Sequence, residues 1–146
     1  MNLLQKVKEE VDKLMPFIYN DLVRANNALD YSALPACVAF RNPTSRWFNN
    51  FGNYCEECDW LLFFVDKTEF DKTSLENEAI IETMKNAGIQ FVRNVRRSSE
   101  LHIIKQIGGS EYKVDKVYEK FDLNTTGVGL QITLRETKGV CNGRPK

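Results

Sequence analysis

The sequence predicts a single α+β domain in which two main helices pack on a mostly antiparallel sheet of about four to five strands. Two observations support this fold class: one strongly periodic helical segment spans residues 73–97, and three strand-like segments follow it. A chain of 146 residues has the length of one domain and can bury a core without disulfides or metals. We therefore expect residues 1–136 to form the domain and residues 137–146, which contain two glycines and a proline, to form a C-terminal tail.

An N-terminal helix is expected over residues 1–29, with a kink or a break near Pro16, because proline interrupts helical hydrogen bonding. Leu4, Val7 and Val11 recur at steps of three and four and therefore lie on one face of this helix. That apolar face has two interpretations. It covers the protein's own sheet, or it forms a seam with a partner chain, which makes these three residues interface candidates.

A short strand is predicted at residues 36–40, followed by a loop over residues 41–52 that begins with the turn signal Asn42-Pro43. Exposed aromatic rings are costly in water, and aromatic residues and arginine are enriched at the centres of protein interfaces. The aromatic residues of this loop either join the core or contact a partner. The interface candidates in this loop are Arg46, Trp47, Phe48 and Phe51.

Residues 59–66 form a nearly continuous apolar run, which predicts a central strand buried on both faces. The helical segment after it begins with Thr73 and Glu76, a pair with the spacing of a capping box. Gly88 lies in the middle of this helix, where glycine costs about 1 kcal/mol relative to alanine. It predicts either a close approach of the helix to the sheet or a break into two shorter helices.

The last strands are predicted at residues 101–107, 112–121 and 128–134. Gly108-Gly109 is a tight-hairpin signal between the first two. The apolar positions of the second change phase, which predicts a β-bulge near Asp115 or Lys116. Apolar and polar residues alternate in the third, which predicts a strand with one face in water.

The composition excludes several classes of protein. Lysine plus arginine equals aspartate plus glutamate, so no global charge attracts the chain to nucleic acid or membrane. No segment approaches the roughly 20 apolar residues of a membrane-spanning helix, and the charged N-terminus lacks the apolar core of a secretory signal. We therefore expect a cytoplasmic origin and no membrane partner.

Four cysteines, Cys37, Cys55, Cys58 and Cys141, are expected to be free thiols, because disulfides are rare in reducing compartments. Cys55 and Cys58 have the spacing of half a zinc site and are the only metal candidates. The second half of such a site is missing, so we predict no metal and no other cofactor.

No catalytic motif is present, so we predict no catalytic residues and a protein that is not an enzyme. His102 is the only histidine and is expected either to point outward from its strand or to be a structural residue with its hydrogen bonds satisfied. The alternative is a small-molecule-binding or enzymatic α+β domain, with polar groups near His102, Glu119 or Arg135 gathered on the concave face of the sheet.

The end of the long helix carries Arg93, Arg96 and Arg97. Basic residues in the last turn of a helix suit the helix dipole, which is the simplest interpretation of this cluster. The same cluster can contact phosphates, which makes a nucleic-acid-binding accessory protein the second alternative.

The order of elements, with an N-terminal helix, a β-hairpin, a central helix and closing strands, resembles that of neck and tail-terminator (tail completion) proteins of tailed phages. The segment Phe121-Asp122-Leu123-Asn124-Thr125-Thr126-Gly127-Val128 is also similar to the late turn-and-strand segment of phage structural proteins from gut bacteria. The resemblance covers most of the chain. It implies a non-enzymatic head–tail connector subunit that forms a ring of six or twelve copies with itself and contacts other virion proteins. Such a subunit is assembled in the bacterial host cytoplasm and becomes part of the virion, with Arg93, Arg96 and Arg97 as candidates to face the DNA channel.

Overall fold

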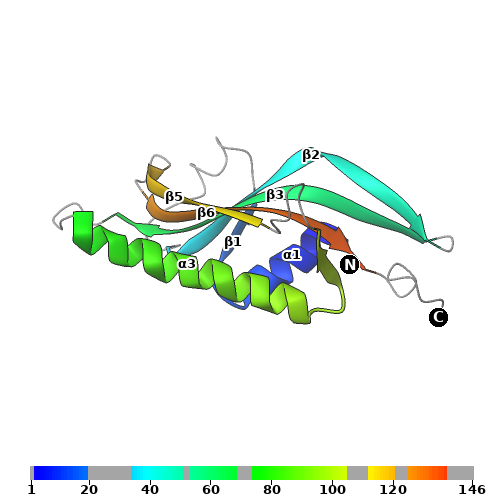
Figure 1. Ribbon diagram of the computed structural model, residues 1–146, viewed down its shortest axis with the longest axis horizontal. Helices are drawn as coiled ribbons and strands as arrows, with labels where there is room; N and C mark the ends of the chain where they lie inside the picture. The colour runs from blue at the N-terminus through cyan, green and yellow to red at the C-terminus, as the bar shows by residue number, and fades with distance from the viewer. Residues whose placement is uncertain are drawn as a thin grey trace.

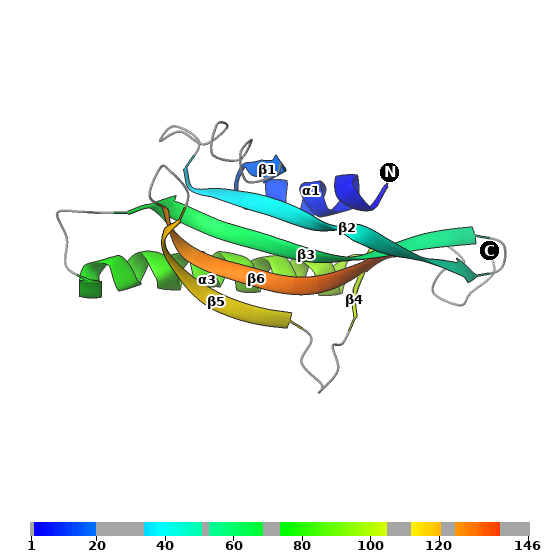
Figure 2. The same cartoon turned by 90° about the horizontal axis from the view of Figure 1, so that it is seen from above.

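The computed structural model describes residues 2–19, 34–50, 53–68, 74–104, 112–120 and 125–137. Within these residues, two helices cover one face of a six-stranded, mostly antiparallel sheet (Figures 1 and 2). The strand order is β1-β2-β3-β6-β4, and β5 also pairs with β6. The predicted α+β class is confirmed. The sheet has six strands rather than four to five, because a short strand forms in a segment that was expected to be helical.

Helix α1 (Leu3–Asp12) begins at a capping box that the sequence analysis did not identify. The side chain of Asn2 accepts a hydrogen bond from the Gln5 backbone N–H, and the Gln5 side chain accepts one from the Asn2 backbone N–H, both at 2.9 Å. These two bonds satisfy backbone donors that the first turn of a helix leaves without partners.

The expected helix over residues 1–29 is wrong beyond Asp12. The chain turns, and β1 (Phe17–Tyr19) pairs in parallel with the start of β2. Pro16 cannot donate a helical hydrogen bond, and its carbonyl instead accepts the Cys37 backbone N–H at 2.9 Å. The rest of the expected helix, residues 20–29, lies outside the described residues.

Strands β2 (Ala36–Asn50) and β3 (Asn53–Lys67) form a long antiparallel hairpin. The predicted loop that begins at Arg41 is therefore wrong up to Asn50. The register shifts between Arg41 and Ser45, so Asn42-Pro43 lies in an irregularity of β2. Pairing of β2 with β3 resumes at Ser45.

Strand β3 is central, as predicted, with β2 on one side and β6 (Thr125–Glu136) on the other. Its even-numbered apolar residues, such as Phe64, join the main core beneath the helices. Phe63 and Val65 are also buried and form a second apolar cluster on the opposite face. Burial on both faces explains why the sequence of this strand lacks alternation.

Helix α3 (Ser74–Arg97) runs along the same face of the sheet as α1 (Figure 1). It is not broken at Gly88. A Cβ atom built there would lie 3.6 Å from Cδ2 of Phe64, so the predicted close approach of helix and sheet is confirmed. Thr73 and the side chain of Glu76, the expected capping pair, lie outside the described residues.

Strands β4 (Leu101–Ile103) and β5 (Tyr112–Lys120) both pair with β6, one after the other along its length. The glycine pair expected to connect them lies outside the described residues. The bulge expected near Asp115 or Lys116 is wrong, because the register is continuous from Tyr112 to Val117 and shifts only after Val117. The change of phase arises because Val117 packs on the second apolar cluster.

The water-facing side expected for the last strand is also wrong. Gln131 is the exposed residue of β6, and nearly all its other residues are buried. The ring of Phe63 lies over Gly129, where a Cβ atom would meet it at 3.0 Å. Thr133 donates a hydrogen bond to Asp59 at 2.6 Å. Side chains of β3 therefore cover positions of β6 that the alternation of apolar and polar residues had assigned to solvent.

Candidate functional site

The end of the β2–β3 hairpin projects beyond the rest of the sheet (Figures 1 and 2). Pairing of β3 with β6 ends at Glu57 and Arg135, whereas pairing of β2 with β3 continues to Asn50 and Asn53. We refer to residues 45–56 as the distal hairpin; residues 51 and 52 lie outside the described residues. The distal hairpin is thus a two-stranded extension of a sheet that is wider elsewhere.

Large aromatic side chains are exposed on the distal hairpin. Trp47 is 72% exposed and Tyr54 is 58% exposed. Trp47 pairs with Glu56, and Tyr54 pairs with Asn49, so the two rings share one face of the hairpin. The sequence left open whether Trp47 joins the core, and the structure places it outside. Phe51, the other aromatic candidate at the tip, lies outside the described residues.

A network of ion pairs fixes the base of the distal hairpin. Glu57 is 5% exposed, and its carboxylate accepts hydrogen bonds from Arg46 Nε at 2.7 Å and from Arg135 Nε at 3.1 Å. Arg46 also donates to Asp59 at 3.2 Å, and Asp59 accepts the Thr133 hydroxyl. The network links β2, β3 and β6, and the carboxylate of Glu57 raises the pKa of Arg46 above its ordinary value.

The same network holds Phe48. The Arg135 guanidinium carbon lies 4.0 Å from the centre of the Phe48 ring, a cation–π arrangement. Of the predicted interface candidates, Arg46 and Phe48 are thus engaged on one face of the hairpin, and Trp47 is exposed on the other. Among the candidates that the structure describes, Trp47 is the one whose side chain is most available to a partner.

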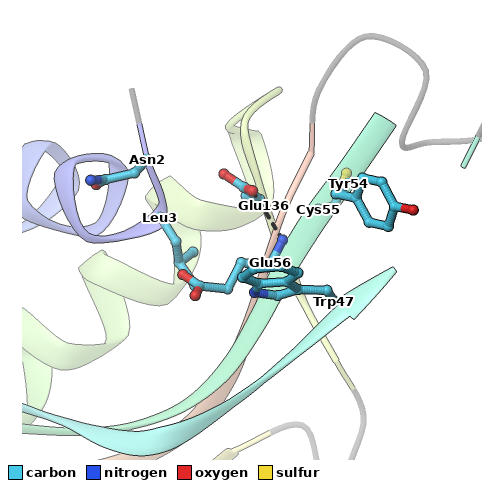
Figure 3. A pocket seen from close by; sticks show the side chains of 7 residues that line it. All are labelled: Asn2, Leu3, Trp47, Tyr54, Cys55, Glu56 and Glu136. Carbon is cyan, nitrogen blue, oxygen red and sulfur yellow. Dashed lines mark hydrogen bonds between the residues drawn. The ribbon is translucent and has the colours of Figure 1, made fainter. Parts of the chain in front are cut away.

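A cavity of about 330 Å³ lies between the distal hairpin and the N-terminus of α1 (Figure 3). Its walls combine aromatic rings, an aliphatic side chain and two carboxylates; the lining residues are Asn2, Leu3, Trp47, Tyr54, Cys55, Glu56 and Glu136. The Glu136 carboxylate accepts the Glu56 backbone N–H at 2.9 Å, and Lys6 Nζ lies 3.6 Å from its other oxygen. Glu56 is also ion-paired, with Arg41 at 3.6 Å, so both carboxylates have cationic partners within the chain and the cavity suits an apolar side chain.

A second cavity, of about 560 Å³, lies at the irregularity in β2. It has a mixed apolar and polar lining made by Phe40, Arg41, Asn42, Pro43, Asp59, Trp60, Leu61, Gln131 and Ile132. Neither cavity is lined by His102 or Arg135, which pair with each other across β4 and β6. His102 is exposed, as expected, and the side chain of Glu119 lies outside the described residues.

The other predicted interface residues are in α1. Val7 and Val11 are fully buried in the main core, and Leu4 packs against it. This face of α1 therefore covers the protein's own sheet, which is the first of the two interpretations that the sequence allowed.

The three arginines considered for DNA contacts are exposed at the C-terminal end of α3. Arg96 and Arg97 lie in its last turn, and Arg93 lies one turn earlier. This position suits the helix dipole and leaves the guanidinium groups on the surface.

The cysteines differ from the expectation of four free thiols. Cys37 and Cys58 are buried free thiols, and burial raises the pKa of both. Cys55 is disulfide-bonded, so the expectation is wrong there. Cys55 and Cys58 are three residues apart in an extended strand, which directs them to opposite faces, so they do not form half a zinc site. No metal-binding group of three His, Cys, Asp or Glu residues occurs in the described part of the chain.

Sequence reasoning missed Tyr54 and the acidic half of the ion-pair network. A signal was present, because Glu57 and Asp59 are two residues apart, as are Thr133 and Arg135. In paired strands this spacing places all four on one face.

None of the helices in the described ranges is long and apolar enough to cross a membrane. No protein-family model matches the chain, and no curated protein sequence matches it either.

Proposed function

We propose that the protein is a structural subunit that assembles through protein–protein contacts, as neck or tail-terminator ring proteins of tailed phages do. In this proposal the distal hairpin contacts a neighbouring copy, and the complete ring has six or twelve copies around a DNA channel. Other neck or tail proteins of the virion are the further partners.

The observation that carries the proposal is the exposure of Trp47 on a projecting hairpin. A tryptophan side chain buries about 200 Å², and apolar burial contributes about 25 cal/mol per Å². Because 72% of Trp47 is exposed, covering it in an interface contributes about 3.6 kcal/mol. Tryptophan is also the residue type most typical of energetically dominant interface positions.

The position of the ring also supports an interface. Trp47 shares its face with Tyr54, and both line the cavity beside α1. A ring requires a heterologous contact, in which one patch of a subunit meets a different patch of the next. A hairpin that extends past its own sheet can reach a neighbour without moving the domain core.

The test is the native mass in solution, measured by light scattering over a range of protein concentrations. We expect a discrete oligomer of six or twelve copies. Trp47→Ala is expected to shift dissociation to higher protein concentration and to leave unchanged the thermal unfolding midpoint of the dissociated subunit, measured at low protein concentration. Val114→Ala is the matched control, because Val114 is an exposed apolar residue on β5, outside the hairpin. A monomer at every concentration would refute self-assembly, and equal effects of both variants would refute the role of the hairpin.

A further inference from the structure

A cavity of about 130 Å³ lies between α3 and strands β5 and β6. Its described lining residues are a glycine, aliphatic residues and a tyrosine, with Lys85 as the one charged residue among them. We propose that this cavity binds a small carboxylate whose apolar body, an aromatic ring or a short alkyl chain, lies inside and whose carboxylate group contacts the ammonium group of Lys85. None of these lining residues belongs to the distal hairpin, so the site does not depend on the proposed ring assembly.

The sheet register explains the apolar walls of this cavity. Tyr112 pairs with Ile132 and Val114 pairs with Leu130, and both β6 residues belong to the main core beneath the helices. Directly paired residues lie on the same face of a sheet, so Tyr112 and Val114 face α3. In Figure 2, β5 lies along the outer side of β6, and α3 runs behind the sheet. Val128 and Leu130, both buried, complete the sheet side of the cavity.

The helix side of the cavity is open because residue 88 is glycine. A Cβ atom built at Gly88 would find its nearest neighbour, Cδ2 of Phe64, at 3.6 Å, which is an ordinary van der Waals distance. The single hydrogen atom of Gly88 therefore leaves volume that a side chain would fill. Ile89 lines the cavity beside it. An ion pair between Lys116 and Glu78 joins β5 to α3, so the two walls are connected directly.

The size and charge of the cavity determine the class of ligand. A dry apolar cavity of roughly 150 Å³ holds one benzene molecule, so about 130 Å³ suits a single six-membered ring or a short alkyl chain. Lys85 lines the cavity although its side chain is 49% exposed. A lysine in this position packs its aliphatic stem along apolar walls and keeps its ammonium group in water. Charge complementarity therefore favours a ligand that carries a carboxylate outside an apolar body.

Lys85 is available for this contact. Its Nζ atom lies 3.8 Å from Oε1 of Glu82, and the Glu82 side chain is 63% exposed. An ion pair between two such exposed side chains contributes little, because water and salt screen it. A ligand carboxylate can therefore share the ammonium group with Glu82.

The test uses phenylacetate as the probe and nitrogen-15 NMR spectra of the whole protein. The backbone amide signals of Gly88, Val114 and Leu130 are expected to shift and to saturate with a dissociation constant of about 1 mM or below. Phenethyl alcohol and phenethylamine are matched probes, because each keeps the phenyl group and replaces the carboxylate with a hydroxyl or an ammonium group. The alcohol is expected to bind about threefold more weakly than phenylacetate, and the amine more weakly still.

Two variants separate the apolar part of the site from its charge. Gly88→Ala places a methyl group in the cavity and should weaken all three probes, phenylacetate by about tenfold. Lys85→Gln should weaken phenylacetate by about threefold and leave phenethyl alcohol unchanged. Asn86→Ala is the control, because Asn86 is exposed on α3 and is not among the lining residues; its affinities should equal those of the wild type.

Three results would each overturn the proposal. The first is a phenylacetate titration that does not saturate, or that shifts amide signals only outside the cavity. The second is an unchanged affinity in Gly88→Ala, whose folding is not in doubt because the methyl group meets its neighbours at ordinary distances. The third is equal affinity for the three probes, which would show that Lys85 does not select a carboxylate.

Discussion

Replacing Gly88 with alanine should stabilise the protein. Gly88 is buried in the middle of α3, where the helix passes over the sheet. A Cβ atom at this position would lie 3.6 Å from Cδ2 of Phe64 and 4.0 Å from Cγ2 of Val128. These are ordinary van der Waals distances, so the added methyl group fits without displacing its neighbours.

The magnitude follows from two contributions. Alanine is more favourable than glycine in a helix interior by about 1 kcal/mol, because glycine loses more backbone entropy on folding. The buried methyl group adds a further favourable term of up to about 0.8 kcal/mol. We expect Gly88→Ala to raise the free energy of unfolding by about 1 kcal/mol or slightly more. In a domain of this size, that change raises the melting temperature by about 3 °C.

The assay is urea unfolding followed by circular dichroism, with the wild type and the variant measured side by side. An increase in the urea midpoint with an unchanged slope indicates a change in stability alone. Gly127→Ala is the control in the opposite direction, because its Cβ atom would lie 2.0 Å from the carbonyl oxygen of Phe64 and the chain must distort. If Gly88→Ala lowers stability, the helix lies closer to Phe64 than this reasoning requires, and the argument is refuted.

Three further predictions concern charges and thiols. Glu57→Gln should lower the free energy of unfolding by about 1–2 kcal/mol, because it weakens the ion pairs with two arginines. These arginines are partly exposed, so salt screens the pairs and the loss should be smaller in high salt. Urea unfolding at two salt concentrations measures both effects. Cys37 should not react with a thiol reagent at pH 8 in the native protein but should react after unfolding. Because burial raises its native pKa, stability should also fall as the pH rises above about 8.5, where the unfolded thiol ionises. If the arginines face DNA, replacing Arg96 and Arg97 with glutamine should weaken DNA binding and reduce its salt dependence; weak wild-type binding that does not vary with salt would exclude this role.

The parts of the fold that were predicted correctly are those whose own residues form a recognisable pattern. The 3.6-residue period over α3 identified the helix, and Gly88 indicated its close approach to the sheet. The continuous apolar run around Phe63 and Phe64 identified the central strand, because both faces of that strand are covered. Each of these signals can be read from a short segment without knowing what the segment contacts.

The errors occurred where long-range pairing decides the structure. Phe17–Tyr19 is a strand because it pairs with Cys37–Ala39, and no pattern within the three residues indicates this. Pro43 was interpreted as part of a loop, but the hairpin accommodates it in an irregularity and β2 continues to Asn50. Propensity describes a residue's local preference, whereas the partner strand supplies the hydrogen bonds that extend β2 past this proline.

The candidate site was predictable in part. Trp47 was identified as an interface candidate because an aromatic residue among polar neighbours either joins the core or contacts a partner. Its exposure was not predictable, because burial depends on how far the hairpin extends beyond β6. Glu57 and Arg135 are 78 residues apart, so their ion pair required the sheet register.

The distal hairpin contributes little to the apolar core, which fits the proposal that this hairpin contacts another molecule. Past Glu57 it loses the support of β6, and two isolated strands are only marginally stable in water. Its base is held by the Arg46 and Arg135 ion pairs with Glu57 rather than by apolar burial. An exposed Trp47 adds almost no stability to such an extension. An extension of this kind that presents a large ring to solvent suits the proposed interface, which would cover the ring.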